Sequence, residues 1–280
     1  MEIKQKQARL KQYLEELGSV AVAFSGGVDS AFLLKTAQDV LGSRVVAVTA
    51  SSCVFPRREL DEAGQFCVRH GIRHIIRETD CLGIEGFAEN PPNRCYLCKR
   101  GIMGIMLETA KEQGAACVIE GSNTDDDADY RPGHRAVAEL GIKSPLREAG
   151  LSKQEIRMLA GQMGLAEWDK PSSACLASRF AYGEKITAGR LAMAEQAEQL
   201  LLDMGFTQMR VRMHGTMARI EVLPQDFARF LDEAVRERIY RTLRGYGFSY
   251  VSLDLQGYRT GSMNEALQVH GGPAADGKNI

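Results

Sequence analysis

The chain has 280 residues, of which 44% are hydrophobic and 25% charged, a composition typical of soluble globular proteins with one large domain or two smaller ones. The net charge of −1 and the pI of about 6.5 argue against a protein that binds nucleic acid or an acidic membrane surface. The first 18 residues predict a charged amphipathic helix without the apolar core of a signal peptide. No apolar run approaches the roughly 20 residues of a membrane span, so we expect a cytoplasmic protein.

Short apolar strands alternate with helical segments through the first two thirds of the sequence. The predicted strands and helices are strands at 19–24, 44–50, 72–78 and 116–121, and helices at 29–42, 57–71, 95–113 and 151–164. The last helix begins after Ser152, a residue typical of N-caps. This alternation predicts an α/β fold in which helices flank both faces of a parallel sheet.

The pattern changes after about Gly183. The predicted order is a helix at 187–204, strands at 208–213 and 218–223 separated by His214-Gly215-Thr216, a helix at 225–245 and a strand at 250–255. This order predicts a small C-terminal α+β domain. We therefore expect a first domain at 1–183, a domain for substrate binding or oligomerisation at 184–260, and a disordered Gly- and Pro-containing tail at 261–280.

An anion-binding loop is predicted where the first strand meets the first helix, in the sequence AFSGGVDSAFLL. Gly26 and Gly27 let the backbone turn sharply, Ser25 and Ser30 offer hydroxyl groups, and the helix N-terminus supplies N–H groups and a positive dipole end. Ligands of open α/β sheets usually bind at this end of the strands. The plainer alternative is that the glycines only form a turn and that Asp29 and Ser30 cap the helix.

The loop is not a Walker A motif, because it lacks the GxxxxGK[ST] pattern and its lysine. The string SGGVDS instead resembles the loop of the PP-loop family of ATP pyrophosphatases. That resemblance implies that Ser25, Gly26, Gly27, Asp29 and Ser30 bind ATP and that Mg²⁺ lies among the phosphates. It also implies that a substrate oxygen attacks the α-phosphate and releases pyrophosphate, but it does not identify the nucleophile that later displaces AMP.

An acidic loop at 120–133 follows the fourth predicted strand at the same edge of the sheet. Gly121 permits a close backbone approach, and Asn123 and Asp125 are expected to reach the nucleotide or its Mg²⁺. A solvated acidic loop is the alternative. The weaker candidates in this loop are Asp126, Asp127 and Asp129.

The sequence PNRCYLCKR contains a CxxC pair, Cys95 and Cys98, at the start of a predicted helix. No second CxxC supplies the remaining ligands of a zinc site. A redox dithiol, spare thiols, or zinc with an unidentified fourth ligand are the alternatives for the pair. The other cysteines outside the sequence around Cys175 are expected to be structural: Cys53, Cys67, Cys81 and Cys117.

Cys175 lies in the sequence WDKPSSACLASRF. Lys170 and Arg179 flank it with positive charge, which favours the thiolate form of a cysteine. Small residues leave room around its sulfur: Ser172, Ser173, Ala174 and Ala177. Cys175 is therefore a candidate for delivering sulfur to an adenylate, and a buried apolar cysteine is the alternative.

Five strings in this order resemble the LarE family of sulfur transferases: SGGVDS, EGSNTDD, SPLREAGLSKQEIR, KPSSACLASR and GYRTGSMNE. The likeness runs from about residue 5 to residue 265. It implies an enzyme that adenylates a carboxylate of pyridinium-3,5-biscarboxylic acid mononucleotide, replaces AMP by sulfur, and then converts the second carboxylate. The product belongs to the synthesis of the nickel-pincer nucleotide, the cofactor of lactate racemase. The resemblance also implies a homo-oligomer, with a hexamer among the expected states.

The family has two versions. One gives up the sulfur of a lone cysteine at the position of Cys175, which becomes dehydroalanine; the other adds a CxxC and holds a [4Fe-4S] cluster with three cysteines. This chain resembles the second version, which implies that Cys95, Cys98 and Cys175 ligate a cluster. Three thiolates leave one iron without a protein ligand, where external sulfide can bind. Sacrificial transfer from Cys175 is the alternative.

Arg210 and Arg212 alternate on one predicted strand, so both side chains face the same way. Two guanidinium groups on one face can hold a phosphate or a carboxylate. The resemblance favours a substrate-phosphate site here, with Glu198 holding the arginines and Arg179 as a further substrate-binding residue. A solvated strand face is the alternative. Arg259 is a weaker candidate for a subunit interface or a neighbouring active site.

Three other classes of protein carry similar loops. A tRNA thiolase also adenylates before it adds sulfur, but it should show a basic RNA-binding surface, and this sequence does not. An amide-forming ligase needs an ammonia source, and the chain has no room for a glutaminase domain. A nucleotide-sensing module would leave the three cysteines without a shared purpose. We therefore expect an enzyme whose partners are the pyridinium mononucleotide and sulfide or another sulfur donor.

Overall fold

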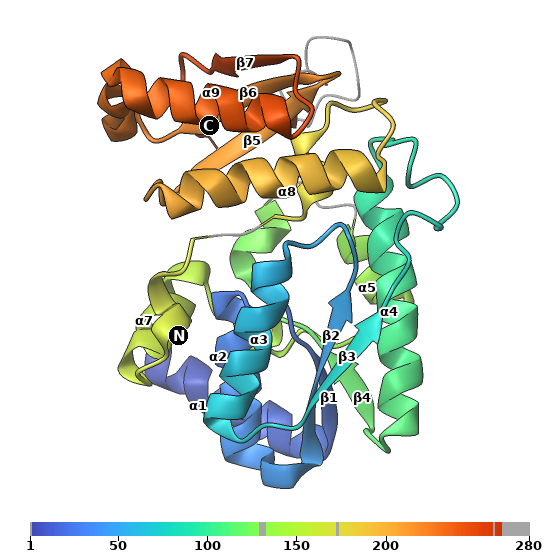
Figure 1. Cartoon of the computed structure of the whole chain (residues 1–280). Coiled ribbons are helices and arrows are strands. Elements are labelled where there is room, and N and C mark those ends of the chain that lie inside the picture. Colours follow the sequence, from blue (N-terminus) through green and yellow to red (C-terminus); the bar gives the residue numbers. More distant parts are fainter. Residues whose placement is uncertain (1, 129–132, 172–173, 260, 265–280) are drawn as a thin grey trace, which may run out of the picture. The chain divides into compact units, whose positions relative to one another are not determined.

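The computed structural model of the chain describes residues 2–128, 133–171, 174–259 and 261–264 (Figure 1). The chain divides into two compact units. The first comprises Met1–Ile84 and Asn93–Ser173, and the second comprises Glu85–Pro92 and Ala174–Ile280. The predicted candidates Asp129, Ser172 and Ser173 and most of the predicted tail lie outside the described residues.

A parallel sheet forms the centre of the first unit, as the sequence predicts. Its strands are β1 (Val20–Ala23), β2 (Val45–Ser51), β3 (His74–Glu78) and β4 (Cys117–Ile119), in the order β3-β2-β1-β4. All three neighbouring pairs are parallel. The strand order reverses between β1 and β4. The carboxyl ends of these two strands therefore form a switch point, the place where open α/β sheets bind ligands.

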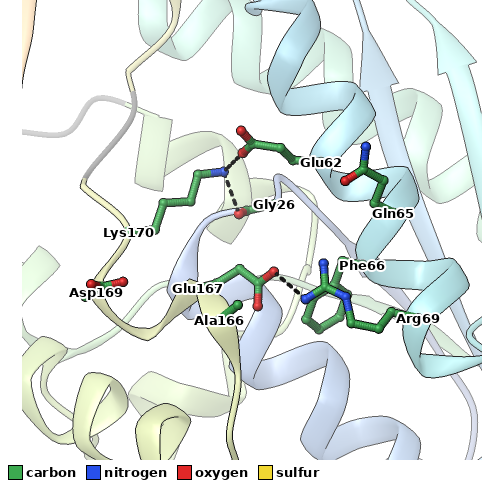
Figure 2. Close-up of a pocket in the computed structure, with 9 residues that line it drawn as sticks. All are labelled: Gly26, Glu62, Gln65, Phe66, Arg69, Ala166, Glu167, Asp169 and Lys170. Atoms are coloured by element: carbon green, nitrogen blue, oxygen red, sulfur yellow. Dashed lines mark hydrogen bonds and ion pairs between the residues drawn. The ribbon is translucent and has the colours of Figure 1, made fainter. Parts of the chain in front are cut away.

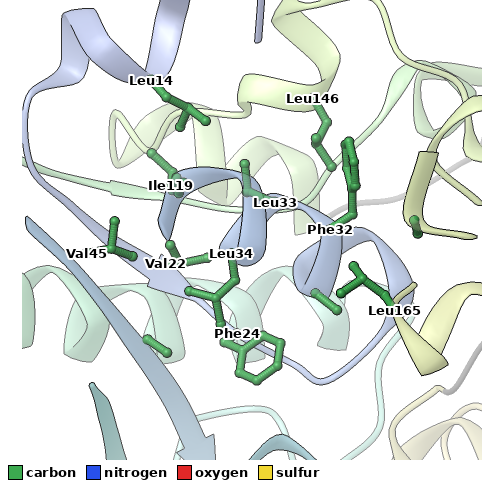
Figure 3. Packing of buried hydrophobic residues seen from close by; sticks show 14 of the residues in the cluster. Leu14, Val22, Phe24, Phe32, Leu33, Leu34, Val45, Ile119, Leu146 and Leu165 are labelled. Carbon is green, nitrogen blue, oxygen red and sulfur yellow. The ribbon is translucent and has the colours of Figure 1, made fainter. Parts of the chain in front are cut away.

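Both faces of this sheet are buried at β1 and β2, whose successive residues point to opposite faces. On one face, Val22 of β1 and Val45 of β2 join a core with Phe32, Leu33 and Leu34 (Figure 3). The helices of this face are α1 (Ile3–Leu17), α2 (Val28–Leu41), α3 (Arg57–His70) and α7 (Lys153–Gln162). The intervening strand residues, such as Ala21 and Val46, are also buried, and α4 (Arg94–Glu112) contacts the strands (Figure 1).

Helix α7 begins where the sequence predicts. The Ser152 hydroxyl accepts a hydrogen bond from the Glu155 N–H at 3.3 Å, and the Glu155 carboxylate accepts one from the Ser152 N–H at 2.9 Å, which is a capping box. Glu155 also forms an ion pair with Lys6 of α1 at 2.7 Å, which fastens the start of α7 to α1. Two short helices between β4 and α7 were not predicted, α5 (Gly133–Glu139) and α6 (Pro145–Glu148).

The second unit contains the predicted α+β elements. Strands β5 (Met209–His214) and β6 (Met217–Val222) form an antiparallel hairpin, and β7 (Tyr250–Leu253) pairs with β6 in parallel. The helices of this unit are α8 (Ala188–Asp203) and α9 (Glu233–Gly245). No helix in the described part of the chain is both long enough and apolar enough to cross a membrane.

The predicted single helix at 225–245 is wrong. Residues Pro224–Leu231 form a 3-10 helix, Asp232 is extended, and α9 starts after it. The Asp232 carboxylate accepts hydrogen bonds from the N–H groups of Ala234 and Val235, at 2.8 and 3.4 Å. Asp232 is thus an N-cap inside a stretch whose apolar spacing reads as one continuous helix.

Candidate functional site: a phosphate loop and two cysteine segments

The loop between β1 and α2, residues 24–27, is termed the phosphate loop and has the features of an anion-binding turn. Gly26 has a φ of +73°, a conformation that favours glycine, and Gly27 is the N-cap of α2 without a side-chain cap. The alternative in which Asp29 and Ser30 cap this helix is therefore wrong. The Ser30 hydroxyl lies 3.1 Å from the Ser25 hydroxyl and donates to the Gly27 carbonyl at 3.0 Å. Two hydroxyls and the first N–H groups of α2 therefore converge at one turn.

Gly121, which follows β4, packs closely against the backbone at the start of α2. A Cβ atom at residue 121 would lie 3.0 Å from the Ser30 nitrogen and 3.3 Å from the Asp29 carbonyl carbon. The preceding residue, Glu120, is buried and accepts hydrogen bonds from Ser122 at 2.8 Å and Ser144 at 2.6 Å. Burial acts to raise the pKa of Glu120, but Lys99 and these hydrogen bonds outweigh it and hold the pKa below its usual value. The loop after β4 is thus anchored tightly against the phosphate loop.

Asp29 is the centre of a polar network at the switch point. Its carboxylate forms an ion pair with the Lys153 ammonium and accepts a hydrogen bond from the Asn123 amide at 3.4 Å. The side-chain amide oxygen of Asn123 accepts a hydrogen bond from the Asp125 N–H at 3.0 Å, and the Asp125 carboxylate accepts one from the Lys153 backbone N–H at 3.0 Å. The structure therefore brings together three predicted residues, Asp29, Asn123 and Asp125. It adds Lys153, a residue that was not predicted to belong to the site.

A second lysine reaches the same loop. The Lys170 ammonium donates to the Gly26 carbonyl at 3.1 Å and forms an ion pair with Glu62 of α3 at 2.6 Å (Figure 2). The Arg157 guanidinium donates a hydrogen bond to the Lys170 carbonyl at 2.7 Å, which holds this segment in place. The sequence predicts that Lys170 places its charge beside Cys175; in the structure its ammonium group is bound to the Gly26 carbonyl.

A cavity of about 290 Å³ opens beside Gly26. Figure 2 shows Lys170 and Glu62 on one side of it and the ion pair between Arg69 and Glu167, at 3.5 Å, on another. The ring of Phe66 forms part of its wall. The cavity offers charged groups of both signs next to the turn that is expected to hold phosphates.

The CxxC pair lies in the first turns of α4. Cys95 is exposed and Cys98 is half-buried, and no disulfide joins any of the described cysteines. The Cys98 sulfur lies 3.9 Å from the sulfur of Cys81, which is fully buried. This hydrogen bond from Cys98 holds the pKa of Cys81 below its usual value, against the effect of burial. Among the described residues, no three Cys, His, Asp or Glu side chains gather as a metal site.

The other cysteines differ in exposure. Cys67 is buried, as predicted, and burial raises its pKa to about 12. Cys117 is half-buried in β4, and burial raises its pKa. Cys53 is exposed, and its expected structural role stays a prediction.

In the second unit, Arg179 clamps the segment that carries Cys175. Its guanidinium donates to the carbonyls of Ala174 and Cys175, at 2.8 and 3.2 Å, and makes two hydrogen bonds of 2.8 Å to the Glu198 carboxylate. Arg179 is only 1% exposed and Glu198 only 5%. Burial acts to raise the pKa of Glu198, but Arg179 and Arg210 hold it below its usual value. Glu198 thus holds Arg179 directly, whereas the sequence predicts that it holds Arg210 and Arg212.

Arg210 and Arg212 of β5 are buried, so the alternative of a solvated strand face is wrong. Arg212 forms an ion pair with Glu221 at 3.0 Å and donates to the Ser178 carbonyl at 3.0 Å. The Arg210 guanidinium lies 5.3 Å from the centre of the Tyr258 ring. Burial and the neighbouring Arg179 lower the pKa of Arg210, which is the effect expected of crowded positive charges.

This arginine cluster extends across the sheet of the second unit. Asp254 accepts hydrogen bonds from Arg219 at 2.7 Å and from Arg259 at 3.3 Å, and Glu221 forms an ion pair with Arg219 at 3.2 Å. These contacts join five guanidinium groups to three carboxylates: Arg179, Arg210, Arg212, Arg219 and Arg259, with Glu198, Glu221 and Asp254. The described side chains of this cluster therefore carry five positive and three negative charges, an excess of two positive charges.

Comparison with known proteins identifies the family. No family model matches the chain. The chain is 40% identical over 265 residues to an uncharacterized protein of Synechocystis sp., an alignment that covers 95% of this chain and 99% of the relative. It is 26% identical over 162 residues to a probable tRNA sulfurtransferase of Methanothermobacter thermautotrophicus, which covers 52% of this chain and 40% of that protein.

A named relative matches along nearly the whole length. The pyridinium-3,5-bisthiocarboxylic acid mononucleotide synthase of Lactiplantibacillus plantarum is 39% identical over 263 residues, which covers 94% of this chain and 95% of the relative. The alignment therefore includes the phosphate loop as well as most of the arginine cluster. The chain belongs to the family of pyridinium-3,5-bisthiocarboxylic acid mononucleotide synthases, the LarE family whose motifs it resembles.

Proposed function

We propose that this protein uses ATP to convert the carboxylates of pyridinium-3,5-biscarboxylic acid mononucleotide to thiocarboxylates. The observation that carries the proposal is the match to the named synthase over 94% of the chain. The phosphate loop supports it, because two hydroxyl groups lie beside a helix N-terminus without a side-chain cap, an arrangement that favours anions such as pyrophosphate.

In the first step, a carboxylate oxygen of the substrate attacks the α-phosphorus of ATP. The bond from the α-phosphorus to its bridging oxygen breaks, pyrophosphate leaves, and an acyl-adenylate forms. The N–H groups of the loop and the hydroxyls of Ser25 and Ser30 hold the departing phosphates. Lys153 and Lys170 supply the positive charge that a Walker lysine supplies elsewhere.

The residues near Asp29 suit Mg²⁺. Mg²⁺ prefers oxygen ligands from one or two carboxylates together with phosphates. Asp29 and Asp125 offer carboxylates, and Asn123 contacts both of these residues. These aspartates would hold the ion, and Lys153 would turn from Asp29 towards the phosphates.

The second step replaces AMP by sulfur. The donor chemistry of Cys95, Cys98 and Cys175 suits a [4Fe-4S] cluster, because all three are cysteines outside any disulfide. These three cysteines would hold the cluster, which would supply external sulfide for the displacement of AMP. Arg179 positions the segment of Cys175 through the carbonyls of Ala174 and Cys175. The arginine cluster binds the phosphate of the mononucleotide.

The adenylation step is tested by measuring AMP and pyrophosphate with the mononucleotide substrate. Both products should appear only when substrate is present, and Asp29→Asn and Ser30→Ala should suppress both. Asp39→Asn is the matched control, because Asp39 lies on the same helix in an exposed ion pair with Lys35. Formation of ADP and orthophosphate instead would disprove the adenylation step.

The sulfur step is tested by comparing Cys98→Ser with Cys175→Ser. If the three cysteines act together, either change should lower iron content and product formation together. The wild type should also form more than one product per chain with added sulfide and keep its mass. Sacrificial transfer predicts a fully active Cys98→Ser variant and a protein lighter by one hydrogen sulfide at Cys175.

A tRNA thiolase is the second candidate, supported by the partial match to a tRNA sulfurtransferase. Stimulation of pyrophosphate release by unmodified tRNA, without the mononucleotide, would favour it. We expect no such stimulation. The family resemblance also supports a homo-oligomer, which light scattering after size-exclusion chromatography would measure.

A further inference from the structure

The cysteine next to the CxxC pair is Cys81, which no step of the proposed chemistry uses. Its sulfur lies 3.9 Å from that of Cys98, and its side chain is fully buried. The two residues are 17 positions apart, one in the segment after β3 and the other on α4. Cys98 thus has a thiol neighbour on a different segment in addition to Cys95 on its own helix.

The packing of the segment after β3 against α4 fixes this pair. The Ile84 side chain lies against Gly101, where an added Cβ atom would come within 2.8 Å of the Ile84 Cδ1 atom. Gly101 is one helical turn after Cys98, so its missing side chain lets the segment of Cys81 press against the same part of the helix. The Ile84 N–H also donates to the Cys81 carbonyl at 3.4 Å, which links the two contact points.

We propose that Cys81 and Cys98 form a reversible disulfide that withdraws Cys98 from sulfur transfer. The sulfurs of a disulfide are about 2.0 Å apart, so the two atoms, now 3.9 Å apart, must approach by about 2 Å. The half-buried Cys98 is the residue that an outside oxidant can reach, whereas Cys81 is reachable only from within the protein.

The oxidant is a small disulfide such as oxidised glutathione. The Cys98 thiolate attacks one of its sulfurs and releases one glutathione thiolate, which leaves a mixed disulfide on Cys98. The Cys81 thiolate then attacks the Cys98 sulfur and releases the second glutathione. Two S–H bonds of the protein are lost, one S–S bond forms, and the oxidant gains two electrons and two protons.

The regulatory consequence rests on the proposed function, in which Cys98 is one of three cooperating cysteines. With Cys98 bound to Cys81, the set of three is incomplete and sulfur transfer stops. Reduction restores it without loss of sulfur from the protein. The chain would therefore stop consuming ATP for sulfur transfer under oxidising conditions and resume when thiols are replenished.

The disulfide can be read directly from tryptic peptides. Cleavage after Arg77, Arg94 and Lys99 places Cys81 in the peptide 78–94 and Cys98 in the peptide 95–99. The full chain is treated with oxidised glutathione, blocked with N-ethylmaleimide in denaturant and digested. We expect the two peptides to be joined, with the mass of their sum less two hydrogen atoms plus one N-ethylmaleimide on Cys95, and to separate after dithiothreitol. A disulfide confined to peptide 95–99, joining Cys95 to Cys98, would overturn the proposal.

Three variants sharpen the result. Cys95→Ser should keep the link between peptides, and Cys98→Ser should lose it. Cys81→Ala should lose the link, keep the iron content of the wild type, and make product formation resistant to oxidised glutathione. A Cys81→Ala protein that folds but loses iron as Cys98→Ser does would make Cys81 a ligand, and the proposal would be wrong.

A matched control is Cys67→Ala, which removes another buried thiol of the same unit. It should leave both the link and the sensitivity to oxidised glutathione unchanged. Because the link is detected by mass, it can be present even where the sulfur-transfer assay fails. Failure of the proposed function and failure of the disulfide are therefore separate outcomes.

Discussion

Replacing Glu198 by Gln should destabilise the second unit far more than an ordinary loss of an ion pair. The Glu198 carboxylate accepts two hydrogen bonds of 2.8 Å from Arg179 and one of 3.0 Å from the Val211 N–H. Both partners of the ion pair are almost fully buried. The Gln side chain would leave the Arg179 charge buried without compensation, which costs about 3–5 kcal/mol in comparable buried pairs. Because Gln keeps one acceptor oxygen, we expect the lower end, about 3 kcal/mol.

Amide hydrogen exchange is the best assay, because a chain of two units need not unfold in one step. The Val211 N–H should exchange about a hundredfold faster in the variant, since each 1.4 kcal/mol of lost stability is about tenfold. The control is Glu237→Gln, which removes a 2.7 Å ion pair with Arg241 on the exposed face of α9. Such exposed pairs contribute about 0.3–0.5 kcal/mol, so the control should change exchange at Val211 very little.

The pH dependence gives an independent check. The folded pKa of Glu198 lies below its ordinary value of 4.5. The stability from its charge is therefore fully present above pH 4.5 and is lost as the pH falls through the folded pKa. The difference in stability between the wild type and Glu198→Gln should shrink as the pH falls below the folded pKa of Glu198. If Glu198→Gln and Glu237→Gln changed exchange of the Val211 N–H equally at neutral pH, the buried ion pair between Glu198 and Arg179 would not have the predicted role.

Three further outcomes follow from single residues. Gly121→Ala should weaken ATP binding, measured by calorimetry, because its Cβ would lie 3.0 Å from the Ser30 nitrogen; the control Gly104→Ala meets nothing within 4 Å and should leave binding unchanged. Arg210→Ala and Arg212→Ala should each weaken binding of the mononucleotide about tenfold or more and leave ATP affinity unchanged, since a charge-assisted hydrogen bond is worth about 1.5–3 kcal/mol. Unchanged substrate affinity in both would remove them from the site. Cys67, with a pKa raised to about 12, should resist alkylation by iodoacetamide at pH 8 in the native chain, as intact and peptide masses would show.

The parallel sheet and the phosphate loop could be predicted because their signals are local. Strands β1 and β2 are runs of small and β-branched apolar residues, buried from both sides, and such runs read as strands without knowledge of the partner. The loop follows from the order of glycines and hydroxyl residues between a strand and a helix. The capping box at Ser152 is likewise confined to four residues.

The partners of the charged residues could not be predicted in the same way. Lys153 meets Asp29 from 124 positions away, and Lys170 meets Gly26 from 144 positions away. Arginine and lysine side chains are long and occur throughout the sequence, so no periodicity marks the ones that reach a given carboxylate. The ion pair between Arg179 and Glu198 was not predicted for the same reason. The break between helices at Asp232 was not predicted for a different reason. An N-cap inside an amphipathic pattern resembles an ordinary polar position of one long helix.

The origin of these two lysines has a consequence for how the loop works. A Walker loop carries its lysine within its own motif, so the charge is present wherever the loop forms. Here both ammonium groups come from the segment that contains α7 and the residues after it. Their position depends on α7 packing against α2 and on the ion pair between Lys6 and Glu155. The proposed phosphate binding is therefore coupled to tertiary packing. Changes that loosen α7, even where they touch no ligand, should weaken ATP binding before they unfold the sheet.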